Sequence, residues 1–212
     1  MKHFQDNEKA EFDYDWLIRQ KYEFKLLALL AVLADNNLAY RGTLSDMCAF
    51  FGVASGNSRT DRKIKDAIIQ LETDGLLKKI TDGRTYTLTL SKKAEKHRRV
   101  IRIQKEWVMI AKGYSTFESR SVSIDWVPLL KVWLYLINGF EEKRTLTTSS
   151  EIAIALNLSI STVKAARAAL EKDIEAILVE KKYKFFPEEE EFSCLGSEIT
   201  PTAWVSDKRS QS

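Results

Sequence analysis

The chain of 212 residues has few of the residues that mark flexible linkers, disulfide frameworks or membrane spans. It holds three prolines and eight glycines, too few for long disordered linkers. Its two cysteines, Cys48 and Cys194, lie far apart in the sequence, so we expect buried thiols in a reducing cytoplasm and no secretory leader. The longest apolar run, residues 26–34, is under half of the roughly 20 residues that span a bilayer. We expect a buried helix over about residues 16–34 and no membrane contact.

Catalytic and metal-binding patterns are also missing. His3 lies in the polar N-terminal segment and His97 in a basic stretch, neither at a spacing that suits a catalytic pair. No phosphate-binding loop, nucleophile elbow or Cys-x-x-Cys motif occurs. Asp13 and Asp15 leave two interpretations open, a solvated acidic patch or a metal site. We expect a protein that is not an enzyme and that needs no cofactor.

The most informative stretch is residues 147–170, TTSSEIAIALNLSISTVKAARAAL, which predicts two short helices joined by a tight turn. Ser149 or Ser150 is the expected N-cap of the first helix, because a serine hydroxyl accepts a free amide of the first turn. Ser159 or Ser161 is expected to start the second helix. This is the arrangement of a helix-turn-helix motif.

The second helix of this stretch has an apolar side and a polar side. Val163, Ala166 and Leu170 are spaced i, i+3, i+7 and predict an inward stripe. Lys164 and Arg167, three residues apart, are expected on a different, solvated face. A short helix that supports a second helix with a small, basic outer face is the design that enters a DNA major groove.

The pattern S-S-E-I-A-x-x-L-N-L-S-x-S-T-V-K-x-A-R-x-x-L resembles the helix-turn-helix of bacterial winged-helix DNA-binding proteins. This resemblance implies a DNA-binding fold and double-stranded DNA as the partner. Two other interpretations stay open: an ordinary helical hairpin in a core, and a winged helix that binds another protein.

A second copy of the motif begins at residue 43. Asp46 matches Glu151 at an offset of 105 (151 − 46), whereas Leu71 matches Leu170 at an offset of 99 (170 − 71). The first copy therefore has six extra residues (105 − 99) between its two helices. An internal repeat of about 100 residues predicts two similar domains.

The second helix of the first copy is predicted over residues 58–73. Its inward stripe has the spacing i, i+3, i+4, i+7 and comprises Ile64, Ala67, Ile68 and Leu71. Gly75 follows the helix as a C-terminal cap, and an Asp-Gly turn at 81–84 joins strands 76–80 and 85–90. The basic residues in the first turns of this helix indicate either an anion contact or a solvated face. Helix, helix-turn-helix and hairpin is the winged-helix order.

Residues 91–112 are predicted as one long basic helix between the two copies. Residues 92–112 hold eight Lys/Arg and two Glu, a net charge of +6 (8 − 2). Its apolar side would comprise Val100, Ile103, Trp107 and Ile110. Three roles stay open: a solvated connector, a clamp on the DNA backbone, or a helix that forms a homodimer.

The second copy has its own helix ahead of the motif, at residues 126–140 with Ser123 or Asp125 as its cap, and its own hairpin at residues 176–199. The turn at residues 187–191 carries four consecutive glutamates, which phosphates would repel. This wing therefore points away from DNA or serves a protein surface. Its aromatic residues, Tyr183, Phe185 and Phe186, belong to the core or stack on bases.

We therefore predict a mainly α chain with small β-hairpin wings (α+β). Two winged helix-turn-helix domains, residues 12–91 and 123–199, are joined by a basic connecting helix and linker, residues 92–122, and followed by a flexible tail, residues 200–212. The candidate DNA-binding residues are Ser58, Arg59, Arg62, Lys63, Lys65, Arg84, Arg98, Arg99, Arg102, Ser161, Thr162, Lys164, Arg167, Lys181 and Lys182.

We expect a cytoplasmic, nucleoid- or plasmid-associated transcriptional regulator. The tandem arrangement is also similar to plasmid replication initiators of Gram-negative type and to phage replication proteins, which leaves replication initiation as an alternative. A third alternative is a winged-helix scaffold for protein contacts. A regulator is expected to bind a palindrome as a dimer, and an initiator to bind direct repeats.

Overall fold

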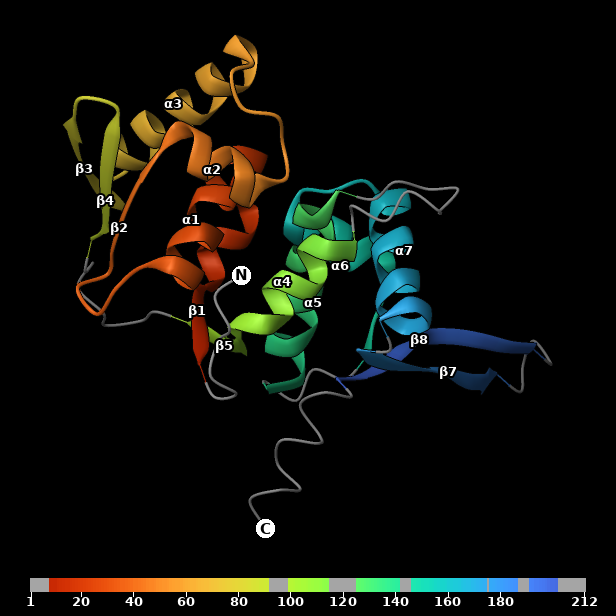
Figure 1. The fold of residues 1–212 in the computed structure, drawn as a ribbon. Coiled ribbons are helices and arrows are strands. Elements are labelled where there is room, and N and C mark those ends of the chain that lie inside the picture. Colours follow the sequence, from red (N-terminus) through yellow and green to blue (C-terminus); the bar gives the residue numbers. More distant parts are fainter. Residues whose placement is uncertain are drawn as a thin grey trace. The chain divides into compact units, whose positions relative to one another are not determined.

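The computed structural model describes residues 8–91, 99–114, 125–141, 146–174, 176–186 and 191–201. The chain divides into two compact units, Met1–Glu118 and Ser119–Ser212. Each unit combines helices with small antiparallel sheets (Figure 1), so the α+β class expected from the sequence is confirmed.

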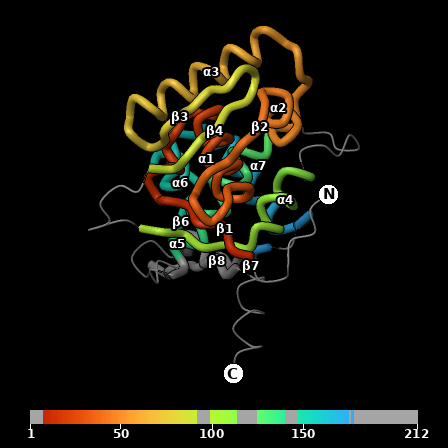
Figure 2. The backbone as a smooth tube through the Cα atoms, turned by 60° about the vertical axis from the view of Figure 1, so that its left-hand side comes forward, coloured from red at the N-terminus to blue at the C-terminus, as the bar shows by residue number. Residues whose placement is uncertain are grey.

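The first unit contains five strands and four α-helices among its described residues. In chain order these are β1 (Lys9–Asp13), a 3-10 helix (Tyr14–Ile18), α1 (Lys21–Leu33), β2 (Ala39–Thr43), α2 (Leu44–Phe51), α3 (Ser58–Thr73), β3 (Leu77–Asp82), β4 (Thr85–Leu90), β5 (Val100–Gln104) and α4 (Lys105–Tyr114). Helix α1 packs against α3 on one side and β1 on the other (Figure 2).

Helix α1 carries the predicted apolar run and forms the centre of the first core. Leu26, Leu27 and Leu29 are fully buried. The expected start at residue 16 is wrong, because residues 14–18 form a separate 3-10 helix whose first turn is capped by Asp13. The buried Lys25 donates from Nζ to the carbonyl oxygen of the last residue of α2 at 3.2 Å, which holds α2 against α1.

The predicted long helix over residues 91–112 is wrong in its middle. Residues 100–104 form β5, which pairs antiparallel with β1. Ile101 and Ile103 are buried and Arg102 between them is exposed, the period of two that a strand has. Helix α4 begins only at Lys105, and its expected inward residue Ile110 is 43% exposed. Residues 92–98 lie outside the described residues.

The second unit has the elements α5 (Trp126–Glu141), β6 (Leu146–Thr147), α6 (Ser149–Leu156), α7 (Ile160–Ala168), a π-helical turn (Ala169–Asp173), β7 (Ile177–Phe186) and β8 (Glu191–Pro201). The expected helix 126–140 is confirmed, and Asp125 accepts a hydrogen bond from Val127 N at 2.9 Å at its start. Strand β8 continues to Pro201, beyond the expected start of the tail at 200, and residues 202–212 lie outside the description.

The two units share one order of elements: a helix, a strand, two helices and a hairpin. Their three-stranded sheets have matching strand orders, β2-β4-β3 and β6-β8-β7. The sequence did not indicate β2 or β6. Each pairs with a single neighbour in its sheet, and neither shows the clean alternation of apolar and polar residues that predicts a strand.

The first helix of each motif is held by equivalent caps. Thr43 and Asp46 form a capping box at the start of α2, and Thr148 and Glu151 form the same box at α6. The expected caps at Ser149 or Ser150 are therefore wrong by one or two residues. Gly52, with φ 68°, ends α2, and Asn157, with φ 51°, ends α6. Each of these three residues of α6 lies 105 positions after its equivalent in α2.

The six extra residues of the first copy fall into two parts. The turn between the helices spans 52–57 in the first unit and 157–159 in the second, a difference of three residues. The remaining three, 58–60, add a first turn to α3, since the equivalent of Ile160 at an offset of 99 is Asp61. This added turn carries Ser58 and Arg59.

Candidate nucleic-acid interface

Helix α3 has the boundaries predicted from the sequence and presents a basic outer face. Its inward stripe is buried as expected, with Ile64 and Leu71 at 0% exposure. Asn57 caps the helix by accepting from the N–H groups of Arg59 at 3.0 Å and Thr60 at 3.3 Å. The candidate residues on α3 are all exposed, namely Ser58, Arg59, Arg62, Lys63 and Lys65.

The exposed basic side chains of α3 make only weak interactions with other residues of the protein. Arg62 Nε lies 3.8 Å from Asp66 Oδ2, but both side chains are more than half exposed, and such pairs contribute little. Lys63 Nζ lies 5.6 Å from the centre of the Tyr22 ring, a cation–π contact. Asp61 in the first turn offsets the cost of placing bases near the positive end of the helix dipole.

A hollow of about 930 Å³ lies between α3 and the N-terminal end of α1. Its wall includes residues of both charges. Lys21 and Lys63 are positive, and Glu23 and Asp66 are negative. A hollow of mixed charge does not by itself select a polyanion, so the candidate interface is the outer face of α3 and not this hollow.

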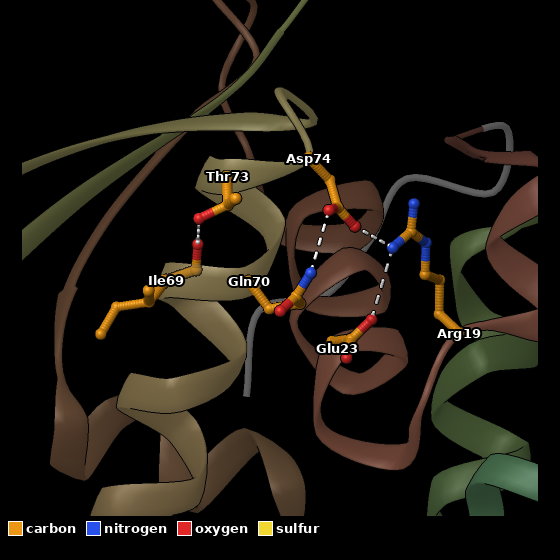
Figure 3. Close-up of polar contacts among 6 residues, drawn as sticks. All are labelled: Arg19, Glu23, Ile69, Gln70, Thr73 and Asp74. Atoms are coloured by element: carbon orange, nitrogen blue, oxygen red, sulfur yellow. Dashed lines mark hydrogen bonds and ion pairs between the residues drawn. The ribbon is translucent and has the colours of Figure 1, made fainter.

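One edge of α3 is fastened to the start of α1 by a polar network (Figure 3). Arg19 Nη1 contacts Asp74 and also lies 3.6 Å from Glu23 Oε2. Gln70 Nε2 donates to Asp74 Oδ1 at 2.9 Å, and Thr73 Oγ1 donates back to the Ile69 carbonyl at 2.8 Å. This network fixes the C-terminal end of α3 and leaves its N-terminal, basic half to face solvent.

The hairpin of the first unit ends in a two-residue turn, Gly83 and Arg84. Gly83 has φ 59° whereas Arg84 does not have a positive φ, the pattern of a type II′ turn. Arg84 is exposed at the tip. Glu72 of α3 holds the hairpin, because its carboxylate accepts from Lys79 N at 3.2 Å and lies 3.4 Å from Lys79 Nζ.

Three basic residues that were expected on the connecting helix contact residues 8–14 instead. Arg102 Nε donates to Glu11 Oε1 at 2.8 Å across the β1–β5 ladder, and Lys105 Nζ lies 3.0 Å from Glu8 Oε2. Arg99 lies over the Tyr14 ring, with 5.8 Å between its Cζ and the ring centre. The prediction that residues 100–104 belong to a helix is therefore wrong, whereas DNA contact by Arg99 and Arg102 stays a prediction; Arg98 lies outside the described residues.

The start of α7 is organised by three hydroxyl groups. Ser159, one of the two residues predicted to start the helix, is the N-cap, and its Oγ accepts from Thr162 N at 3.1 Å. The same oxygen lies 2.9 Å from Ser161 Oγ and 2.7 Å from Thr162 Oγ1. The candidate residues Ser161 and Thr162 are thus tied to the cap, with Ser161 exposed and Thr162 half-buried.

Further along α7, the predicted solvated face is observed for Lys164 but not for Arg167. Lys164 is exposed, whereas Arg167 is half-buried and its Nη1 donates to Ser149 Oγ at 3.0 Å. Burial lowers the pKa of Arg167, and Glu171 acts against that shift. Arg167 takes the place that the buried Ile68 has in α3 (167 − 68 = 99), so it braces α7 against α6.

The remaining candidates belong to the second hairpin. Lys181 and Lys182 lie on β7, opposite Ser197 and Gly196 of β8, with a register irregularity after Lys182. The side chains of these lysines and residues 187–190 of the acidic turn lie outside the description. Their predicted roles in DNA or protein contact stay predictions.

No metal or reactive-thiol site is formed by the described residues. No group of three or more His, Cys, Asp and Glu side chains among them is placed to hold a metal ion. Asp13 serves as the cap of the 3-10 helix, accepting from Asp15 N at 3.1 Å. The Cys48 thiol is buried as expected, and its pKa is raised by burial and by Asp61.

Among the same residues, no single helix is long and apolar enough to cross a membrane; α6 and α7 with its π-turn reach that length only as a bent pair, by length and composition. No protein-family model and no curated protein matches this chain.

Proposed function

We propose that this protein binds double-stranded DNA through two winged helix-turn-helix modules and acts as a transcriptional regulator. The observation that carries the proposal is the repeated order of elements, with matching strand orders β2-β4-β3 and β6-β8-β7 and matching capped helices. A helix held in this way by a preceding short helix, with a hairpin beside it, is suited to enter a major groove.

The first module supplies most of the electrostatic affinity. Arg59, Arg62, Lys63 and Lys65 are exposed on α3, and Arg84 is exposed at the hairpin tip. Each basic side chain that neutralises a phosphate releases a counterion, which favours binding and makes the binding constant dependent on salt. The exposed guanidinium groups of Arg59 and Arg62 can also donate two hydrogen bonds to guanine O6 and N7.

The test is a binding titration on random-sequence duplex over a range of salt concentrations. We expect the logarithm of the binding constant to fall linearly with the logarithm of salt, by about 0.9 for each phosphate contacted. Arg62→Ala combined with Lys65→Ala should weaken binding and flatten the slope. Arg41→Ala, which removes an exposed arginine from β2, is the matched control and should bind as the wild type does. A slope near zero would favour the protein-scaffold alternative.

Replication initiation is the second candidate, because paired winged helices also suit iterated origin sites. Sequence selection from a random duplex pool separates the two roles. A palindromic site bound by a dimer supports regulation, whereas direct repeats bound by one chain support initiation.

A further inference from the structure

The outward faces of the two equivalent helices carry different chemistry. In α3 the positions farthest from the buried stripe hold Arg62, Asp66 and Ile69. At an offset of 99, the same positions of α7 hold Ser161, Ala165 and Ala168. Two of these three positions are charged in α3, whereas in α7 none is charged and they present one hydroxyl and two methyl groups.

The methyl groups of α7 are accessible in this structure. Ser161 and Ala168 are exposed, Ala165 is half-buried, and Ile160 at the first position of the helix is 46% exposed. The equivalent of Ile160 in the first unit is the acidic Asp61. Ile160 therefore offers an apolar contact at the start of α7, whereas the exposed isoleucine of α3, Ile69 at 53%, lies in the C-terminal half of that helix.

The polar groups of α7 are largely occupied within the protein. Arg167 donates to Ser149, and the hydroxyls of Ser161 and Thr162 lie within hydrogen-bond distance of Ser159 Oγ. Lys164 remains exposed and suits a phosphate. The face is thus better equipped for apolar contact than for hydrogen bonds to base edges.

Only one base edge in the major groove is apolar, the 5-methyl group of thymine, which side chains such as alanine contact directly. We propose that α7 reads thymine methyl groups through Ile160, Ala165 and Ala168, whereas α3 reads guanine through its arginines. The DNA target then has two unlike parts, one rich in thymine and one containing guanine. This inference rests on the proposed DNA binding.

The test uses duplex DNA selected by the full-length protein from a random pool. The selected pool is copied with deoxyuridine in place of thymidine, which removes only the 5-methyl group, and in parallel with 7-deazaguanine, which removes the N7 acceptor. We expect the uracil copy to bind more weakly by about fourfold for each methyl contacted. Equal affinity for the thymine and uracil copies would overturn the inference.

Variants assign the effect to α7. Ile160→Ala should reduce the difference between the thymine and uracil copies and leave the 7-deazaguanine effect unchanged. Ile154→Ala, which removes an isoleucine 83% exposed on α6, is the matched control and should keep the full difference. A difference that Ile160→Ala and Ala168→Gly leave intact would place methyl reading elsewhere and overturn the assignment. Failure to select any duplex would instead refute the proposed DNA binding itself.

Discussion

Arg167 Nη1 donates a hydrogen bond to Ser149 Oγ at 3.0 Å, joining the second helix of the C-terminal motif to the first. The equivalent position in the N-terminal motif is the apolar Ile68, which is buried. The same position of the motif thus holds a buried apolar side chain in one copy and a hydrogen-bonded arginine in the other. We infer that Arg167 contributes to the stability of the second unit.

The first prediction concerns the stability of the second unit. Arg167→Ala should lower its free energy of unfolding by about 1.5–3 kcal/mol, the usual contribution of a hydrogen bond to a charged group. Arg167→Ile, which restores the residue type of the first copy, should lose much less stability because the side chain refills the site. Urea unfolding of both variants measures the difference.

Lys164→Ala is the control for this experiment, since Lys164 is exposed on the same helix. It should unfold as the wild type does, because substitutions at exposed sites usually change stability by less than about 0.5 kcal/mol. If Arg167→Ala instead unfolded normally and lost only DNA affinity, Arg167 would be a contact residue, as the sequence first indicated.

The sequence identified those elements whose local and long-range signals agree. Helix α3 was predicted with its observed boundaries, because the stripe through Ile64 and Leu71, the start at Ser58 and the glycine after its end all indicate the same element. The first hairpin was predicted for the same reason, since an Asp-Gly turn separates two strand-like segments.

Other elements depend on contacts with residues far away in the sequence, which the pattern within one segment does not indicate. Val100 and Ile103 have the spacing of a helical stripe, but they are β-branched residues that also favour a strand. Pairing with β1, some 90 residues earlier in the chain (100 − 13 = 87), decides the outcome. The alternation of Ile101, Arg102 and Ile103 was the signal that pointed to a strand. The i+4 position of the α7 stripe, where Arg167 stands in place of an apolar residue, likewise indicated that this arginine lies beside the buried side of the helix.

A second prediction concerns close packing in the first sheet. A Cβ added at Gly42 would lie 2.2 Å from Oη of Tyr40, whose ring is buried. Burial is also the main reason why the pKa of Tyr40 is raised to about 12. Gly42→Ala should therefore destabilise the first unit by about 1–3 kcal/mol, the usual cost of overpacking.

The matched control is Gly113→Ala in α4, where an added Cβ meets nothing within 4 Å. Because alanine favours a helix more than glycine does, this variant should be neutral or more stable. Thermal unfolding followed by circular dichroism compares the two variants. A normal melting temperature for Gly42→Ala would mean that Tyr40 moves aside without cost.

A third prediction uses the capping box at α2. Asp46 Oδ2 accepts from Thr43 N at 2.7 Å and from Thr43 Oγ1 at 2.8 Å, and these bonds lower the pKa of Asp46 below its ordinary value of 3.8. A lowered pKa in the folded state means that the stabilisation is complete above 3.8 and is lost as the pH falls through the folded-state pKa.

Asp46→Asn should therefore be less stable than the wild type at neutral pH, and the difference should shrink in acid below pH 3.8. Urea unfolding at a series of pH values measures it. Thr43→Ala, which removes the partner hydroxyl, should lower stability by about 1 kcal/mol, the usual loss on removing an N-cap. A stability difference for Asp46→Asn that does not change with pH would show that the capping box does not shift this carboxyl.

The fourth prediction distinguishes basic residues that stabilise the fold from basic residues that contact DNA. Arg102 is paired with Glu11 on the β1–β5 ladder, with both side chains more than half exposed, so a double-mutant cycle should give a coupling of about 0.2–1 kcal/mol. Arg102→Ala should leave the salt slope of DNA binding unchanged. Arg62→Ala on α3 should reduce that slope by about 0.9, one phosphate contact. Equal reductions for the two variants would place the basic segment around β5 in the DNA interface and contradict a purely structural role for Arg102.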